Sequence, residues 1–182
     1  MTSIKQDLEY LSAGLNELED YLVSEELYWR LAVHSRLPKL TIGTLLLAGK
    51  KLNTRLQAGT DIQNLQASTV LMDAIRSEWP AAWERKIKRE FHARLNLWQN
   101  YLQDYFESPG KNSSEYVHQV QWRVILQVLY LESTTPPQEV FGLSHLDDNM
   151  IPFWLQGDFV WEPELKQAFP EKEYWFLYGK LI

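Results

Sequence analysis

The sequence predicts an all-α fold: a single-domain bundle of about five or six helices, with an irregular aromatic C-terminal segment packed on it. Apolar residues recur at steps of three and four through most of the first 134 residues, and no strand-like alternation of useful length occurs. The chain of 182 residues is long enough for one well-buried core and short for two. We therefore expect one domain over 1–182, made of a helical bundle at 1–134 and an acidic, aromatic segment at 135–182.

The first predicted helix begins at Ser3, which forms a capping-box pattern with Gln6. Its apolar residues are spaced by alternating steps of four and three: Ile4, Leu8, Leu11, Leu15, Leu18 and Leu22. This spacing fits a coiled-coil seam, but the run ends after about three heptads, so a bundle core is favoured. Ser24 and the two glutamates after it predict a second, short helix that ends near Leu31.

Capping and breaking residues bound the next two helices. Thr41 predicts the start of a helix that stops near Gly59. Thr60, with a glutamine three residues later, predicts another capping box and a helix that ends near Trp79. Each of these two segments is therefore expected to form one helix of the bundle.

The longest predicted helix runs from Pro80 to Phe106, because proline favours the first helical turn. Asn112 or Ser113 then caps a helix that ends near Glu132. Residues 124–131 of that helix are apolar nearly all round, which indicates a central buried position.

Beyond Pro136 and Pro137 the chain becomes rich in aromatic residues and is interrupted by further prolines. Short helices and turns are expected there. The aromatic side chains fit the end of the core better than an exposed recognition face, since so many bare rings would make the protein poorly soluble. If some are exposed, Trp154, Trp161 and Trp175 are the candidate anchors for a partner.

The composition excludes several classes of protein. Apolar residues make up 45% and charged residues 23% of the chain, as in ordinary globular proteins. The absence of cysteine excludes disulfides and thiolate metal sites. No signal-peptide pattern and no apolar run of the roughly 20 residues that a bilayer demands is present, so we expect a soluble, cytoplasmic protein without membrane contact.

Residues 84–94, here called the basic segment, form the main candidate site. On a helix, Arg85, Lys88, Arg89 and His92 lie opposite the apolar stripe, and Lys50 and Lys51 form a second basic patch on another helix. A solvated helix face, a phosphate site and a protein contact all fit this pattern. The net charge of −6 and the pI near 5.3 disfavour a dedicated nucleic-acid domain.

The C-terminal segment carries charge of the opposite sign. Between residues 135 and 173 it holds eight acids against two lysines. Such a polarised chain can place its acidic end on its own basic helix, or offer each face to a different subunit. Positive charge facing water is normal on a helix, so a solvated face stays the first interpretation of the basic segment. Of its functional interpretations, a protein contact is favoured, with the acidic partner inside or outside the chain.

Metal and catalytic motifs are weak. Glu115 and His118 share a helix face at the spacing of di-iron ligand pairs, but a second such pair is missing, so no metal and no cofactor is expected. His145 next to Asp147 and Asp148 could form an acid–base site, although a turn or cap explains these residues more simply. No nucleophile elbow, phosphate loop or dinucleotide fingerprint occurs.

These observations favour a non-enzymatic helical interaction protein or an accessory subunit of a larger assembly, with a protein partner that is either a second copy or a different subunit. Nucleic-acid binding through the basic helix face is the alternative hypothesis. A helical-bundle metalloenzyme is the third.

Overall fold

The computed structural model describes residues 3–32, 36–56, 59–109 and 113–182. It confirms the all-α class, since helices dominate and the described residues form only one small two-stranded sheet. The chain divides into two compact units, Met1–Glu90 and Phe91–Ile182, and helix α5 runs from the first into the second. The single domain predicted for 1–182, with its division at 134–135, stays a prediction. Among the described residues, no helix combines the length and apolar character needed to cross a bilayer.

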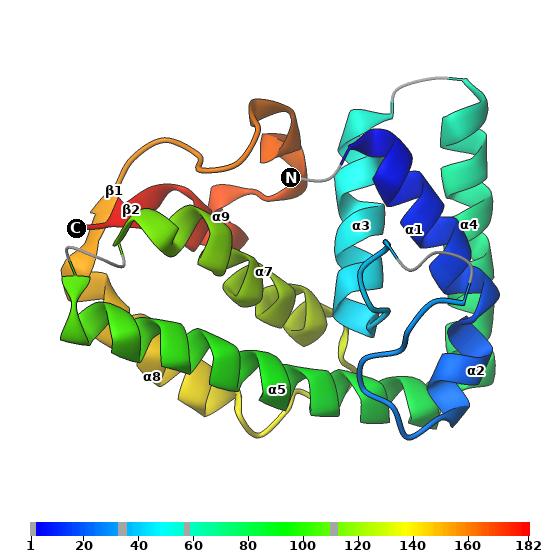
Figure 1. Cartoon of the computed structure of the whole chain (residues 1–182), viewed down its shortest axis with the longest axis horizontal. Helices are drawn as coiled ribbons and strands as arrows, with labels where there is room; N and C mark the ends of the chain where they lie inside the picture. The colour runs from blue at the N-terminus through cyan, green and yellow to red at the C-terminus, as the bar shows by residue number, and fades with distance from the viewer. Residues whose placement is uncertain (1–2, 33–35, 57–58, 110–112) are drawn as a thin grey trace. The chain divides into compact units, whose positions relative to one another are not determined.

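The first unit contains α1 (Ile4–Asn16), α2 (Leu18–Val23), α3 (Ile42–Arg55), α4 (Thr60–Glu78) and the first part of α5 (Pro80–Glu107). Helices α1, α3 and α4 pack against one another (Figure 1). Gly14 permits the close approach of α1 to α3, because a Cβ there would lie 2.8 Å from Leu45 Cδ1. The core includes Leu11, Leu15, Leu18 and Leu22, which supports the bundle-core interpretation of the first apolar stripe.

The predicted caps at Ser3 and Thr41 are confirmed, and the one at Thr60 is wrong. Ser3 and Gln6 form a capping box at the start of α1, and Thr41 caps α3. The capping box at Thr60 does not form, because Thr60 lies inside α4 and Gly59 precedes it as the N-cap residue. Gly59 has φ 90°, a left-handed conformation that a glycine adopts easily. Helix α4 therefore begins after a glycine and has no side-chain cap.

The helix predicted over 4–22 is broken at Glu17, which separates α1 from α2. The Glu17 carboxylate accepts hydrogen bonds from Trp29 Nε1 at 2.7 Å and from Ala32 N at 2.8 Å. It therefore ties the helix junction to the following loop.

The prediction of a short helix from Ser24 to Leu31 is wrong. Ser24 ends α2 as its C-cap residue, and the following residues are irregular apart from a single antiparallel bridge between Trp29 and Leu40. Ser24 and the glutamates therefore belong to a loop, whose carbonyl groups bind basic side chains of α5 as described below.

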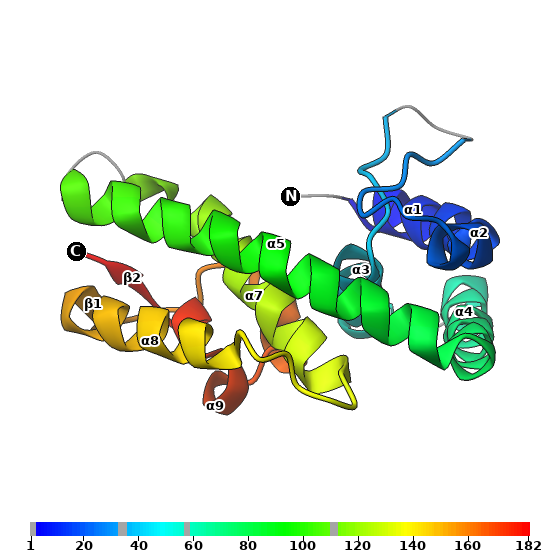
Figure 2. The same cartoon turned by 90° about the horizontal axis from the view of Figure 1, so that it is seen from below.

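The second unit begins with the rest of α5 and continues with helical elements: η1 (Ser113–Glu115), α7 (Tyr116–Glu132), α8 (Val140–Met150), η2 (Ile151–Phe153), η3 (Pro163–Ala168), α9 (Glu171–Tyr174) and η4 (Trp175–Leu177) (Figures 1 and 2). Its two strands are β1 (Trp154–Gln156) and β2 (Gly179–Leu181). The predicted cap at Asn112 lies outside the described residues, and Ser113 opens a 3₁₀ turn before α7.

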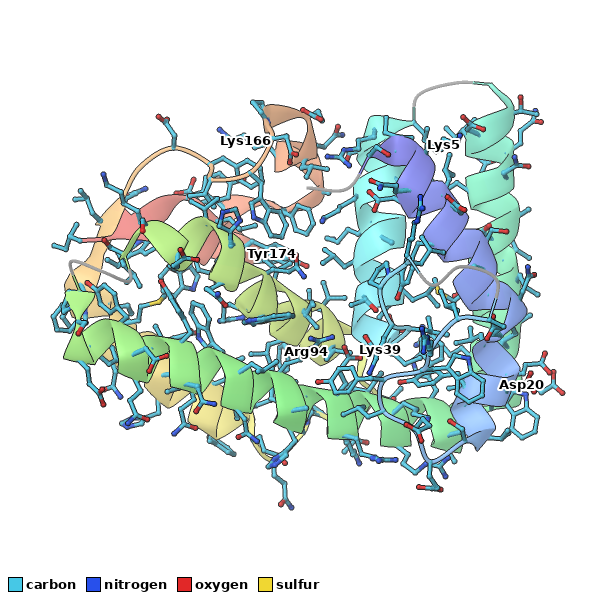
Figure 3. The ribbon with its side chains drawn as sticks, viewed as in Figure 1. Lys5, Asp20, Lys39, Arg94, Lys166 and Tyr174 are labelled. Atoms are coloured by element: carbon cyan, nitrogen blue, oxygen red, sulfur yellow. The ribbon has the colours of Figure 1, made fainter. Side chains whose placement is uncertain are left out.

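Aromatic side chains form the core of the second unit. The rings of Trp98 and Tyr101 on α5 lie 6.3 Å and 6.5 Å from that of Tyr116 on α7. The Tyr116 hydroxyl donates to Phe176 O at 2.5 Å, and Tyr174 of α9, labelled in Figure 3, is fully buried. The aromatic C-terminal segment therefore packs on the helices, as the sequence predicts.

The β1–β2 ribbon was not predicted, because three-residue strands are too short to produce a visible alternation. Trp154 pairs with Leu181, and Gln156 pairs with Gly179. A Cβ at Gly179 would lie 2.3 Å from the Leu155 carbonyl oxygen and 2.5 Å from Trp154 Cζ2, so only glycine lets the strands and the indole approach this closely.

Candidate functional site

The basic segment binds the carbonyl groups at the end of α2. Arg85 Nη2 donates to Leu22 O at 2.9 Å. Lys86, which is fully buried, donates from Nζ to Ser24 O at 3.0 Å, Ser24 Oγ at 3.2 Å and Glu26 O at 2.5 Å. These three acceptors match the three donors of an ammonium group. The two cations thus compensate the negative end of the α2 dipole.

Glu90 makes the complementary contact at the start of α3. Its carboxylate, fully buried, accepts from Thr41 Oγ1 at 2.5 Å and from Gly43 N at 2.8 Å. A carboxylate at a helix N-terminus is stabilised by the dipole and by unpaired N–H groups. One face of α5 therefore holds both ends of the α2–α3 connection, with positive charge at one end and negative charge at the other.

The environment of Lys86 also changes its acidity. Burial, together with the smaller effect of the positive charges of Arg89 and Arg85, lowers its pKa from 10.5 to about 8. The Tyr21 ring, whose centroid lies 4.0 Å from Nζ, stabilises the charged form. Lys86 was not singled out from the sequence, because its burial depends on a loop about 60 residues away.

The other predicted basic residues differ in exposure. Lys88 is exposed on α5, and Arg89 Nη1 lies 3.4 Å from Glu25 Oε2 at the surface. His92 is exposed, with Nδ1 3.5 Å from Glu139 Oε1. On α3, Lys50 is half-buried and Lys51 is buried. Phosphate or partner binding by these six residues, Arg85 included, stays a prediction.

Arg94, the last residue of the basic segment, is 5% exposed. It lies on the side of α5 that carries the core residues, and its guanidinium is 4.8 Å from the centroid of the Trp122 ring (Figure 3). Stacking on an aromatic face is a common way to accommodate a buried arginine. Arg94 is therefore part of the packing between α5 and α7.

The three candidate tryptophan anchors are packed to different degrees. Trp161 is buried, donates from Nε1 to Val117 O at 3.4 Å and stacks edge-on against Phe169. Trp154 and Trp175 are half-buried, and their perpendicular rings lie 5.5 Å apart. Partner binding by these three residues stays a prediction, although their main contacts are with other aromatic rings of the same unit.

The weak metal and catalytic candidates are not assembled into larger sets. Glu115 and His118 are both exposed, and in the described part of the chain no three His, Asp or Glu side chains could together hold a metal ion. Asp147 is bound by Arg123 through two hydrogen bonds, Nε to Oδ1 at 3.0 Å and Nη2 to Oδ2 at 2.8 Å. His145 lies next to Asn149 at the surface. Asp147 therefore acts as the partner of a buried arginine.

A group of exposed apolar side chains surrounds the β1–β2 ribbon and was missed in the sequence. We call it the ribbon patch; it comprises Phe106 (37% exposed), Ile151 (53%), Phe153 (40%), Leu155 (51%) and Ile182 (61%). The rings of Phe106 and Phe153 lie 5.3 Å apart, and Ile182 N donates to Phe153 O at 3.1 Å. These residues come from three separate parts of the chain, so no local sequence pattern predicts that they lie close together.

Described residues of the first unit line two open clefts. One, of about 750 Å³, is lined by residues that include Tyr28, Trp29, Arg30 and Lys39. The other, of about 770 Å³, lies between α1 and α4, where Lys5 marks the first turn of α1 (Figure 3). Both linings mix acidic, basic and apolar side chains, and they favour no single class of ligand.

No protein-family model matches this chain, and no curated protein or solved structure shows significant similarity to it.

Proposed function

We propose that the protein is a non-enzymatic interaction protein, an accessory subunit of a larger cytoplasmic assembly, and that it binds a protein partner through the ribbon patch. The observation that supports this proposal is the exposure of five large apolar side chains in and beside the ribbon, of which Phe106 and Phe153 have rings 5.3 Å apart, in a unit whose other aromatic residues are mostly well packed. Scattered apolar residues are normal on a surface, whereas a contiguous group indicates an interaction site.

The contribution of the patch to binding can be bounded. Complete burial of one such side chain contributes roughly 1.5–3 kcal/mol, and those of the patch are already about half buried. Removal of two of them should therefore weaken binding by about 2 kcal/mol, or roughly thirtyfold. This loss is large enough to be seen in a capture experiment.

The test compares matched variants of the full chain as baits in an extract of the native cell. Phe153→Ser combined with Leu155→Ser alters the patch, and Phe141→Ser, at a ring that is 85% exposed on α8, serves as the control. Partners retained by the wild type and by the control should be lost from the patch variant. Equal retention by all three baits, or a strictly monomeric protein with no partner, would contradict the proposal.

A further inference from the structure

Along its outer edge, β1 has backbone N–H and C=O groups that point away from β2. Ile182 N donates to Phe153 O, and Gly157 N donates to Tyr178 O, so the hydrogen-bonded positions of β1 recur at every second residue. Residues 154 and 156 of β1 therefore point their backbone groups outward. Among the described residues the sheet has no third strand.

The outward groups of β1 can be specified. The Trp154 N–H donates to Ile151 O within the preceding 3₁₀ turn. The Trp154 carbonyl and both backbone groups of Gln156 remain, and no described residue is hydrogen-bonded to them. Gln156 itself is exposed, with only its side chain held, by a bond from Nε2 to Glu171 Oε1 at 3.0 Å. The edge of β1 can thus form backbone hydrogen bonds with another strand.

The side chains beside this edge determine what such a strand would contain. Leu155 lies on one face of β1, since side chains alternate along a strand. Phe153, the last residue of η2, continues the ladder two residues earlier through the bond from Ile182 N to its carbonyl oxygen. Both are exposed and apolar, and they belong to the ribbon patch. A paired segment would therefore place apolar side chains at alternate positions over this face.

Charge determines the rest of the partner's chemistry. Residues 91–182 hold six Lys and Arg against twelve Asp and Glu, a net charge of −6. Glu171 touches Gln156, and Asp158 is exposed two residues beyond β1. Lys180, opposite Leu155, is the cation of the ribbon itself. A second copy of the chain would bring like charges together, whereas a basic segment would be attracted.

We propose that β1 accepts an extended segment of a partner protein as a third strand, and that this segment is apolar at alternate positions and net basic. The inference rests on the proposed function and specifies how the ribbon patch is used. Backbone hydrogen bonds to the edge of β1 supply affinity that depends little on sequence, and the alternate apolar residues and positive charge supply selectivity.

The test uses a phage-displayed library of random dodecapeptides, selected on the full chain. Enriched peptides should alternate β-branched or aromatic residues with others and carry net positive charge. Binding of the selected peptide should fall at least tenfold in Gln156→Pro, because proline removes an N–H that the β1–β2 pairing does not use. Gln156→Ala, which keeps that N–H and loses the same side-chain bond to Glu171, should bind within twofold of the wild type.

A second readout does not depend on the folding of the proline variant. In the wild type, hydrogen exchange of the Gln156 amide should slow at least tenfold when the selected peptide binds.

Enriched peptides with helical spacing or an unprotected Gln156 amide would overturn strand addition and leave the ribbon patch as a binding surface. A wild-type dimer that Gln156→Pro dissociates would overturn the proposed partner, because the edge of β1 would then pair with a second copy of the chain. Failure to enrich any peptide, or enriched peptides whose binding is unchanged by Leu155→Ser, would count against both proposals.

Discussion

Lys86 is the residue whose environment departs most from that of a surface cation, because its ammonium is enclosed by Ser24, Glu26 and the Tyr21 ring. We expect Lys86→Met to lower the free energy of unfolding by about 2–3 kcal/mol at pH 7, since three acceptors lose a charged donor. Lys88 is exposed and has no such enclosure, so Lys88→Met should change the free energy of unfolding by less than about 0.5 kcal/mol. Urea unfolding monitored by tryptophan fluorescence measures both.

The same residue predicts a pH dependence. Its pKa in the folded chain is lowered to about 8, whereas in the unfolded chain it stays near 10.5. Between these values the unfolded state binds the extra proton, so the stability of the wild type relative to Lys86→Met should rise with pH from 8 to 10.5 and stay constant below 8. A stability difference between the two proteins that falls over this range would contradict the buried position of the ammonium.

Two glycines predict opposite outcomes of the same substitution. Gly179→Ala should destabilise the protein by about 1–3 kcal/mol, because its Cβ would meet the Leu155 carbonyl and the Trp154 ring. Gly49→Ala should stabilise it by about 0.5–1 kcal/mol, since Gly49 lies within α3 and no atom lies within 4 Å of the new methyl group. Thermal unfolding of both variants provides the comparison, and a stable Gly179→Ala would show that the ribbon is packed differently.

At the scale of elements, α8 is held to α7 by one buried ion pair. Arg123 is 5% exposed, and its guanidinium binds Asp147 in a bidentate manner and lies 4.1 Å from the Phe176 ring centroid. Asp147→Asn should cost about 3–5 kcal/mol, because it leaves a buried charge without its partner. The double variant Arg123→Met with Asp147→Leu should recover most of that loss. A loss in the double variant equal to the sum of the losses in Arg123→Met and Asp147→Leu alone would indicate that the pair is not coupled.

The bounds of the elements show which parts of the fold can be predicted from residues that are close together in the sequence. Ser3 with Gln6, Thr41, and Pro80 predict helix starts correctly, because capping and proline geometry depend on residues within one turn. The helix start predicted at Ser24 is wrong. A serine followed by two glutamates has the local pattern of a helix start, and the bond from Lys86 to the Ser24 carbonyl, which belongs to a loop, is not visible in the sequence. The ribbon was missed because its pairing joins residues about 25 apart over only three positions.

The candidate site was predictable to a smaller extent than the fold. The basic segment is visible as a run of like charge, and a contact within the chain was among its interpretations. Its acceptors lie about 60 residues earlier, and several of them are backbone carbonyls, which any residue supplies. The ribbon patch gathers side chains from α5, the η2–β1 segment and the end of β2, so it follows only from the tertiary structure.

For the whole molecule, buried tyrosines predict the alkaline limit of stability. Burial raises the pKa of Tyr101, Tyr105, Tyr116, Tyr174 and Tyr178 above the usual value of 10. The contribution of these groups is fully present below pH 10 and is lost above it, because only the unfolded chain releases their protons. Absorbance at 295 nm during an alkaline titration should show these tyrosines ionising together with unfolding. Reversible ionisation of all nine tyrosines near pH 10 in the folded protein would contradict this prediction.

Photocrosslinking in the native cell tests most directly whether the molecule binds a partner protein through the ribbon patch. The photoreactive residue p-benzoylphenylalanine would replace Leu155 in the ribbon patch, or Phe141 on α8 as the control, since both side chains are exposed. Partner binding through the ribbon patch predicts an adduct with a distinct protein from position 155 and none from position 141. The absence of an adduct at position 155, or the same adduct from both positions, would contradict it.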